Sequence, residues 1–87
     1  MDEGSEIRRK RLRYSSRRRG TKELDLILGR FVERHLAGLS TAELDRYEAL
    51  LGCDDGDIYA WVVGRASPPP GLADDILSLI RSANTNF

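Results

Sequence analysis

The sequence predicts an all-α protein, a compact bundle of five short helices. Three observations carry this prediction. Apolar residues recur at intervals of three and four, the period of an α-helix, along successive segments. Ser, Thr and Gly stand at the starts and ends of these segments, where they cap helices. No alternating run of β-branched residues indicates a strand, and no fixed-period repeat indicates a solenoid.

The length of 87 residues predicts a single domain, 1–87, with disorder expected at 1–4 and 84–87. A chain of this size buries about 60–65% of the surface that it exposes when unfolded. That is enough for one modest core. It leaves little room for a deep active site that excludes water.

The first helix is expected to run from Ser5, as its cap, to about Ser15. Its apolar positions are few: Ile7, Leu12 and Tyr14. We therefore expect this helix to be held weakly and to show mainly Arg and Lys to solvent. Gly20 follows it and permits a sharp turn or a close approach of another backbone.

The second helix is expected from Lys22 to about His35, with Thr21 as its cap and Gly38 as its stop. One face carries the i, i+3, i+4, i+7, i+11 spacing of a buried stripe. The residues of that stripe are Leu24, Ile27, Leu28, Phe31 and His35.

A capping box, Ser40 with Glu43, predicts the start of the third helix, and Gly52 predicts its end. Its apolar side is formed by Leu44, Tyr47 and Leu51. A fourth helix is expected over 55–63, ended by Gly64. It presents Ile58, Trp61 and Val62.

Three prolines, 68–70, predict a stiff extended connector before the fifth helix. Asp74 and Asp75 near the start of that helix and Arg81 near its end suit the helix dipole. Its apolar face is Leu72, Ile76, Leu79, Ile80 and Ala83. We expect the shared core to contain Leu24, Leu28, Phe31, Leu44, Tyr47, Trp61, Ile76 and Ile80.

The zero net charge hides an asymmetry between the two parts of the chain. Residues 1–22 hold nine Lys or Arg and three acids, a net charge of +6, and residues 23–87 hold five Lys or Arg and eleven acids, a net charge of −6. A basic arm could meet an acidic partner, a nucleic acid or a membrane surface. It could equally be neutralised by the acidic remainder of its own domain.

The sequence predicts a cytoplasmic protein that does not enter a membrane. One cysteine, Cys53, excludes an internal disulfide, and no apolar run approaches the roughly 20 residues that span a bilayer. The Arg-rich start resembles an organellar transit peptide. However, Asp2, Glu3 and Glu6 argue against that interpretation, because transit peptides are poor in acids.

No catalytic residue and no metal ligand can be assigned, so we expect a protein that is not an enzyme. His35 falls on an apolar stripe, and Cys53 stands beside acids that would raise the pKa of a thiol. Asp54, Asp55 and Asp57 resemble the start of a calcium loop, but the loop lacks the glycine and the distal Glu at their required positions. No phosphate-binding glycine loop or dinucleotide fingerprint is present.

Nucleic-acid binding is the alternative that charge supports. The basic run 8–19 could neutralise several phosphates, and the helices around Gly38 resemble a helix-turn-helix. The second of those helices, however, carries Glu43, Asp45 and Glu48 against Arg46 alone, and acids are repelled from a groove. This disfavours sequence-specific DNA binding and leaves weak RNA contact open.

Arg19, Gly20 and Glu23 form the remaining informative segment. On helical geometry Arg19 and Glu23, four apart, would share a face. One interpretation is an ordinary surface ion pair. The other is a docking point, since a glycine beside the pair lets a partner's backbone or a flat ligand come close.

The segment 11–25 resembles the signature of the succinate dehydrogenase assembly factor 2 family, whose hallmark is R-G-x-x-E. Here the hallmark residues are Arg19, Gly20 and Glu23. The resemblance covers roughly residues 8–80. It continues through Phe31, Leu39-Ser40 with Glu43, Tyr47 with Leu50-Leu51, and the acidic turn and Trp-containing helix of 54–61.

The resemblance implies a five-helix, chaperone-like protein that we expect to be a monomer when free. Its implied partner is the flavoprotein subunit of succinate dehydrogenase, and in bacteria sometimes that of fumarate reductase. It would promote the covalent link between a histidine of that subunit and the 8α carbon of FAD, and would bind no FAD stably itself. An antitoxin-like role, described for some relatives, stays open.

The same resemblance implies which residues meet the partner. Gly20 would permit close approach, and Arg19 and Glu23 would make charge-assisted contacts. Neighbouring arginines would steer association: Arg8, Arg11, Arg17 and Arg18. Two serines at 15–16 depart from some relatives, which leaves the roles of the flanking side chains open.

Overall fold

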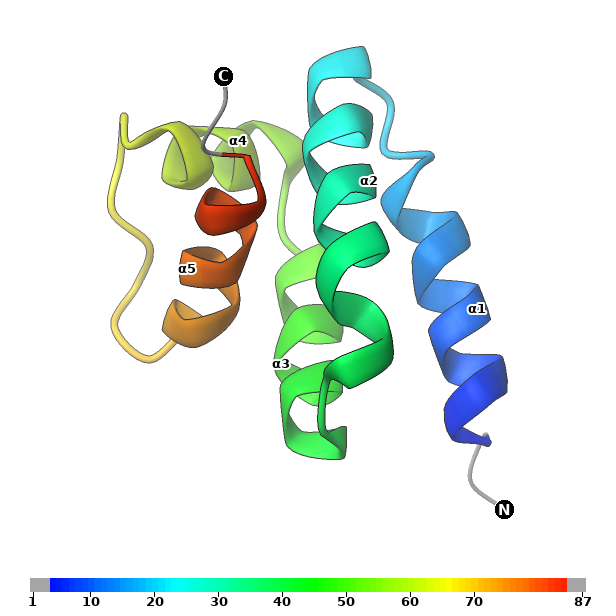
Figure 1. The fold of residues 1–87 in the computed structure, drawn as a ribbon. Helices are drawn as coiled ribbons and strands as arrows, with labels where there is room; N and C mark the ends of the chain where they lie inside the picture. Colours follow the sequence, from blue (N-terminus) through cyan, green and yellow to red (C-terminus); the bar gives the residue numbers. More distant parts are fainter. Residues whose placement is uncertain (1–3, 85–87) are drawn as a thin grey trace.

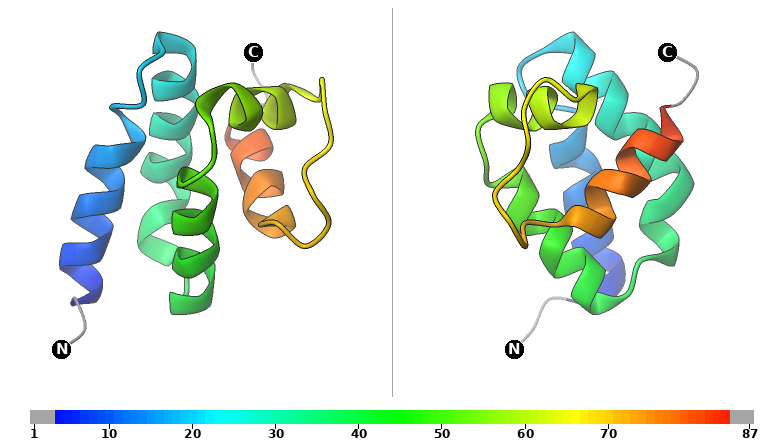
Figure 2. Two further views of the ribbon diagram at one scale, coloured as in Figure 1. Left: turned by 180° about the vertical axis from the view of Figure 1, so that it is seen from behind. Right: turned by 90° about the vertical axis from the view of Figure 1, so that its left-hand side faces the viewer.

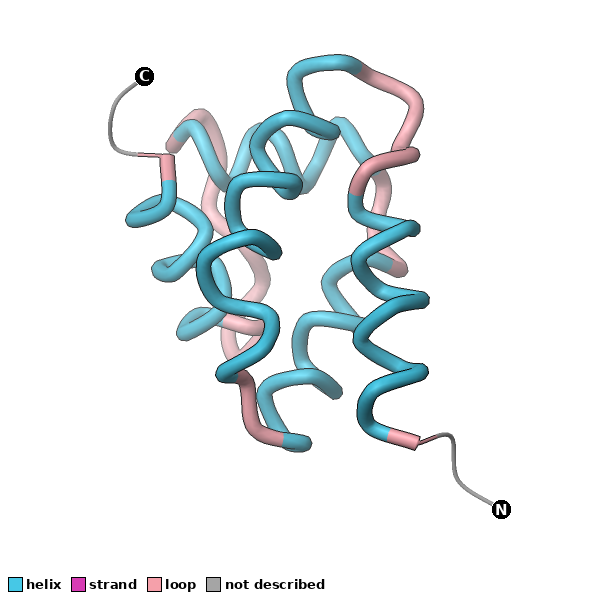
Figure 3. The backbone as a smooth tube through the Cα atoms, turned by 45° about the vertical axis from the view of Figure 1, so that its right-hand side comes forward, coloured by secondary structure: helices cyan, strands magenta, loops and turns pink. Residues whose placement is uncertain are grey.

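The computed structural model describes residues 4–84, and within them it confirms the all-α prediction (Figures 1 and 3). The helices are α1 (Ser5–Ser16), α2 (Lys22–His35), the short 3₁₀ helix η1 (Leu36–Gly38), α3 (Thr41–Leu51), α4 (Asp55–Val63) and α5 (Asp74–Ala83). The described part of the chain contains no strand. None of its helices is long and apolar enough to cross a bilayer.

Helix α2 is the centre of the bundle (Figure 1). It packs against α1 on one side and α5 on the other, and α3 contacts both of those helices. Helix α4 packs on α5 and lies across one end of the bundle, close to the start of α2 (Figure 2). The turn between α1 and α2 therefore meets the start of α4 at that end.

One apolar cluster holds the five helices together, and all eight residues predicted for the core belong to it. It also contains residues that the stripe pattern missed: Val32, Leu36, Leu39, Leu50, Ala73 and Leu77. Leu77 is buried because α5 packs against α2, α3 and α4, so more than one stripe of that helix faces protein.

Helix α1 differs from its prediction in both its cap and its apolar face. Gly4, not Ser5, is the N-cap, and no side chain caps this end. Ile7 and Tyr14 are each 63% exposed, and Leu12 is the buried apolar residue of the helix. Because α1 lies at the edge of the bundle, only a narrow face of it contacts the other helices, and Leu12 is the apolar residue on that face.

The predicted N-cap of α2 and the predicted caps of α3 and α4 are confirmed. Gly38 does not stop α2, however, because that helix ends at His35 with Leu36 as its C-cap, and η1 follows it up to Gly38. Thr21 Oγ1 accepts a hydrogen bond from the Leu24 amide at 3.3 Å. Ser40 and Glu43 form the reciprocal capping box, with bonds of 2.8 and 3.2 Å. Gly64 ends α4 in the left-handed conformation, with φ of +82°. These features are local, which is why sequence reasoning finds them.

The last helix begins later than predicted, at Asp74, so Leu72 lies before it in the connector. Ala73 is its N-cap with φ of +50°. Residues 1–3 and 85–87, for which disorder is predicted, lie outside the described residues. Asn84 does not fit that prediction: it is buried and donates Nδ2 hydrogen bonds to the carbonyls of Ile27 at 3.1 Å and Ile80 at 2.8 Å.

Candidate partner-binding site

The turn that carries the R-G-x-x-E motif begins where α1 ends, at a buried polar contact. Ser16 is fully buried, donates to the Leu12 carbonyl at 2.6 Å, and shares a hydrogen bond with the Tyr47 hydroxyl. Burial raises the pKa of Tyr47 above its ordinary range, and the Ser16 hydrogen bond and the Arg19 charge offset part of that rise. The end of α1 is thus fixed to α3 by side chains.

Arg19 is not helical and does not pair with Glu23, so the expectation that both lie on one helical face is wrong. Its guanidinium lies against the start of α4 instead. Nε donates to Asp55 Oδ1 at 2.9 Å, Nη2 lies 2.7 Å from the same oxygen, and Nη2 also donates to the Cys53 carbonyl at 3.2 Å. The Arg19 amide donates to Asp25 Oδ1 at 2.6 Å.

Gly20 is exposed and has φ of +114°, a backbone conformation that L side chains rarely adopt. The sharp turn expected at this position is therefore present. A methyl group in place of its hydrogen would lie 3.6 Å from Asp55 Oδ2, an ordinary contact distance. The backbone conformation, and not a lack of space, requires glycine here.

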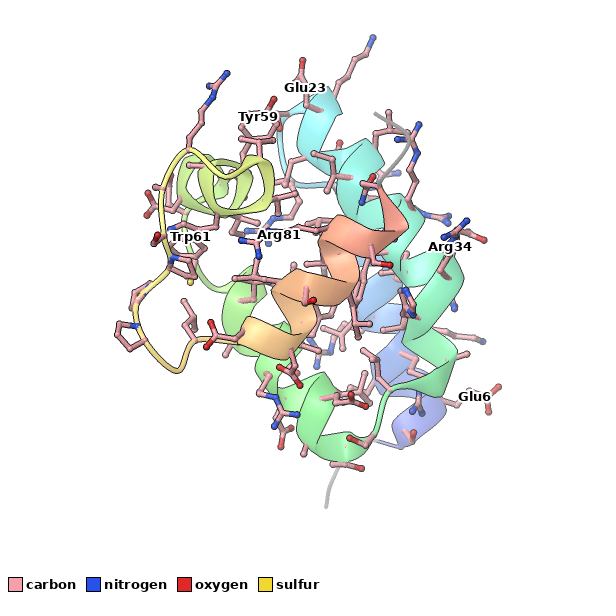
Figure 4. All side chains as sticks on the ribbon, turned by 60° about the vertical axis from the view of Figure 1, so that its left-hand side comes forward. Glu6, Glu23, Arg34, Tyr59, Trp61 and Arg81 are labelled. Carbon is pink, nitrogen blue, oxygen red and sulfur yellow. The ribbon has the colours of Figure 1, made fainter. Side chains whose placement is uncertain are left out.

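Glu23 is exposed in the first turn of α2, where its negative charge suits the helix dipole. It lines a concavity of about 250 Å³ with Thr21, Asp55, Gly56 and Tyr59. Figure 4 shows Glu23 and Tyr59 close together at one end of the molecule. An acid beside a half-buried aromatic ring, both within reach of a partner, can accept a cationic or N–H donor group.

A second, basic concavity of about 710 Å³ opens on the other side of Gly20, along α1. Its lining residues are Lys10, Arg13, Tyr14, Arg17, Arg18, Gly20 and Asp25. The Arg18 guanidinium carbon lies 4.8 Å from the centre of the Tyr14 ring, within cation–π range. Tyr14 thus presents an exposed ring on a positively charged surface.

The arginines predicted to steer the partner do not form one patch. Arg17 crosses Gly29 and pairs with Glu33 on α2. Arg8, 17% exposed in its side chain, pairs with Asp45 at 2.6 Å and with Glu48 at 3.0 Å on α3. The hydrogen bond to Asp45, more than the other neighbouring charges, raises the pKa of Arg8.

Arg11 also reaches α3, with Nη2 3.1 Å from Glu48 Oε2. Arg9, which sequence reasoning passed over, donates to the carbonyls of Leu36 at 3.1 Å and Leu39 at 2.5 Å. Arg8, Arg9 and Arg11 therefore attach α1 to the rest of the bundle. Arg17 and Arg18 lie on the concavity beside Gly20.

The two residues weighed as nucleophile or base occupy structural positions. The His35 ring lies 5.7 Å from that of Phe31, centre to centre, and Cys53 Sγ lies 3.7 Å from the Ala49 carbonyl oxygen. Among residues 4–84, no group of three His, Cys, Asp or Glu side chains gathers closely enough to hold a metal ion.

The comparison with known families decides the identity. The family model described as "Flavinator of succinate dehydrogenase" matches residues 10–84. The chain belongs to this family. The resemblance carried by Arg19, Gly20 and Glu23 is therefore confirmed at the level of the family.

Curated members of the flavinator family share a third to a half of the aligned residues. Succinate dehydrogenase assembly factor 2 of Debaryomyces hansenii is 51% identical over 59 residues, 68% of this chain and 42% of that protein. The Candida glabrata protein of the same name is 44% identical over 72 residues, 80% and 47% of the two chains. Assembly factor 2-B of Drosophila simulans is 37% identical over 82 residues, 92% and 53%.

All three relatives are named as mitochondrial proteins. The chain spans about half the length of the curated relatives it matches.

Within this chain, the structure brings Gly20 and Glu23 to one exposed end and turns Arg19 inward. The sequence did not reveal Asp55 as the partner of Arg19, because an aspartate at that position is explained equally well as a favourable charge at the start of a helix. Nor did the sequence reveal Tyr59 beside Glu23. No local signal marks either contact, since Asp55 lies 36 positions from Arg19 and the packing of α4 alone joins them.

Proposed function

We propose that this protein promotes the covalent attachment of FAD to the flavoprotein subunit of succinate dehydrogenase, with the fumarate reductase subunit as a further client. The observation that carries the proposal is the family match over residues 10–84, in a chain whose hallmark residues Gly20 and Glu23 are exposed at one end of the bundle. The relatives' names describe assembly factors of the same enzyme.

The proposed mechanism is positioning. The linking histidine and the flavin both belong to the partner, so this chain supplies no reacting group. The imidazole nitrogen and the 8α carbon would each lose a proton as they join, and the two electrons would pass into the partner's flavin ring, which would end reduced. This step needs the imidazole and the 8α carbon in near-attack geometry, and orientation of this kind lowers a barrier substantially. A small rigid bundle docked beside the flavin site would hold a mobile part of the subunit in that geometry.

Within this proposal, Gly20 and Glu23 contact the subunit directly. Gly20 leaves the exposed turn without a side chain, and Glu23 offers a carboxylate beside Tyr59. Arg17 and Arg18, on the neighbouring concavity, steer the approach. Arg8 has a smaller role there than the sequence suggests, because its guanidinium is engaged by Asp45 and Glu48.

The proposal includes a monomer that binds no FAD stably, holds no metal and has no catalytic activity of its own. The contacts of His35 with Phe31 and of Cys53 with the Ala49 carbonyl support the absence of a catalytic nucleophile and base. Gel filtration followed by a flavin absorbance scan and elemental analysis tests it. FAD that co-elutes in stoichiometric amount, or a stoichiometric metal, would contradict it.

A cytoplasmic location also belongs to this proposal. The named relatives are mitochondrial, so the two compartments are the alternatives. Fractionation of the source cells, with the client subunit followed in parallel, decides between them.

The decisive experiment compares two single charge reversals, one at each end of the molecule. Glu23→Lys should reduce covalent flavin on the co-expressed subunit, read by in-gel fluorescence, by about tenfold or more, because a like charge placed at an interface costs several kcal/mol. Glu6→Lys is the matched control: Glu6 is an exposed acid at the opposite end of the molecule (Figure 4). It should leave flavinylation unchanged.

The same pair of variants tests the nucleic-acid alternative, including an antitoxin-like regulator. The basic concavity at Tyr14 and Arg18 is the surface that favours it. There Glu23→Lys adds positive charge near the basic face and should strengthen salt-sensitive RNA binding. Full flavinylation by folded Glu23→Lys, with tighter RNA retention, would replace the assembly function by that alternative.

A further inference from the structure

Of the three hallmark residues, Arg19 is the least accessible to a partner. Its side chain is 16% exposed, and that of its partner Asp55 is 27% exposed. The guanidinium donates hydrogen bonds to a carboxylate oxygen of Asp55 and to the backbone carbonyl of Cys53, both at the start of α4. The side chain of Arg19 is therefore bonded within its own protein and is not directed toward a partner.

The Arg19 backbone is also held by a hydrogen bond to a carboxylate. Its amide donates to Asp25 Oδ1 at 2.6 Å, and Asp25 belongs to the first turns of α2. One residue therefore connects the α1–α2 turn, the start of α2 and the start of α4. Since these bonds involve ionised groups, they are stronger than those between neutral groups.

Gly20 is the next residue, and its backbone conformation is one that L side chains rarely adopt. Its φ is +114°, and the Asp55 carboxylate that binds Arg19 lies beside it. Asp55 also lines the concavity that contains Glu23 and Tyr59. The Arg19–Asp55 pair thus lies directly beneath the surface formed by Gly20 and Glu23.

We infer that Arg19 is a positioning residue: together with Asp55 it locks the α1–α2 turn onto α4 and presents Gly20 and Glu23 to the flavoprotein subunit. This inference rests on the proposed function. It replaces the sequence-based expectation that Arg19 contacts the partner itself, and it assigns to Asp55 a role equal to that of Arg19.

A double-mutant cycle tests the inference. Arg19→Gln and Asp55→Asn keep the side-chain size and remove the charge pair. Each should weaken binding of the purified flavoprotein subunit, and covalent flavin formation, by about tenfold. The double variant should be no weaker than the worse single variant, because both changes break the same pair. Asp55→Glu, which keeps a carboxylate within reach, should restore most of the binding.

The control pair is Arg46 with Asp75, which joins α3 to α5 by bonds of 2.8 and 3.1 Å. Asp75→Asn breaks another Arg–Asp pair away from the motif, between side chains that are 43% and 45% exposed. Binding measured well below the unfolding temperature should not change for Asp75→Asn. A loss caused by general destabilisation would affect both pairs, whereas a positioning role affects only the Arg19–Asp55 pair.

Hydrogen exchange of the free protein provides a readout that needs no partner. Amides of residues 17–22 should exchange about tenfold faster in Asp55→Asn than in the wild type. Full binding by Asp55→Asn with loss in Arg19→Gln, or additive losses in the double variant, would show that Arg19 contacts the subunit and overturn the inference. Unchanged exchange in Asp55→Asn would overturn it as well.

Failure of the proposed function has a different signature. If the wild-type protein neither binds the subunit nor raises its covalent flavin, the assembly role itself is wrong. The exchange measurement then still reports whether Arg19 and Asp55 order the turn. The two failures are therefore distinguishable within one set of samples.

Discussion

At the scale of single residues, Gly20 is required for its backbone conformation. Its φ of +114° is strained for any L residue, while the space for a methyl group exists 3.6 Å from Asp55 Oδ2. We expect Gly20→Ala to lower the free energy of unfolding by about 1–3 kcal/mol, as other sparsely populated conformations do. The protein should still fold, because Gly20 lies outside the core.

Gly38→Ala is the matched control for that prediction. Gly38 is exposed, has no positive φ, and nothing would lie within 4 Å of the added methyl group. It should change stability by less than about 0.5 kcal/mol. Chemical denaturation of both variants checks the pair, and equal effects at the two glycines would contradict the conformational explanation.

Tyr47 makes a second residue-scale prediction, on pH. Burial raises the pKa of its phenol in the folded protein above the ordinary value of about 10, so the unfolded chain ionises first as the pH rises. The stability from this shift is present below pH ~10 and is lost as the pH rises above that value. Tyr47→Phe should reduce the fall in melting temperature above pH ~10.

Tyr14→Phe is the control on the alkaline side, because Tyr14 is 63% exposed. The wild type and Tyr14→Phe should lose stability alike between about pH 10 and pH 12. If Tyr47→Phe follows the same curve as both, ionisation of Tyr47 is not what destabilises the fold at high pH.

The sequence could predict contacts between residues that are close along the chain, and it could not predict contacts between residues that are far apart. Ser40 and Glu43 are three positions apart, so their capping box can be recognised from the sequence alone. The Arg19–Asp55 pair spans 36 positions and the Ser16–Tyr47 hydrogen bond 31. Either pair could be found only after the packing of α1, α3 and α4 was known.

At the scale of elements, α1 is attached mainly through polar contacts. Leu12 is its buried apolar side chain, and Ser16 anchors its end. Elsewhere it is joined by Arg8 and Arg11 to α3 and by Arg9 to the carbonyls around η1. That this helix is held weakly stays a prediction, and the arginines expected in solvent bond instead to α3 and to the carbonyls around η1.

We expect α1 to loosen at high salt while α2 does not. At about 1 M salt the screening length falls to roughly 3 Å, which weakens exposed ion pairs and leaves apolar packing intact. Amides of α1 should exchange faster in hydrogen-exchange measurements under those conditions, and those of α2 should not. Arg8→Gln should reproduce the effect at low salt and reduce the salt response. Equal acceleration in both helices would contradict this account.

The helix boundaries follow the same logic. Lys22–His35 could be predicted because its apolar period and its cap at Thr21 agree. The start of α5 could not, because Leu72 fits the apolar stripe and only the connector geometry, with Gly71 and Ala73 both at positive φ, excludes it from the helix.

At the scale of the whole molecule, the interpretation in which the domain's own acids neutralise the basic arm holds in part. Four arginines of the basic segment meet acids of the remainder across the fold: Arg8, Arg11, Arg17 and Arg19. The acidic part thus neutralises much of the basic arm, as the sequence allowed. Lys10, Arg13 and Arg18 instead line the concavity around Tyr14, on the side of Gly20 away from Glu23.

This surviving basic surface predicts how association depends on salt. Replacing Lys10, Arg13 and Arg18 together by Gln should slow association with the flavoprotein subunit about threefold to tenfold at low salt and flatten its salt dependence, because rim charges act mainly on the association rate. Dissociation should change little, since the contact assigned to Gly20 and Glu23 is intact. Stopped-flow kinetics over a salt series measures both rates.

Arg34→Gln, an exposed arginine at a distance from the motif end, is the control for a general charge effect (Figure 4). Its association rate should fall far less than that of the triple variant. If the triple variant instead dissociates faster at an unchanged association rate, these side chains form part of the contact itself. The docking surface would then extend from Glu23 across Gly20 onto α1, and the basic arm would bind the subunit as well as guide it.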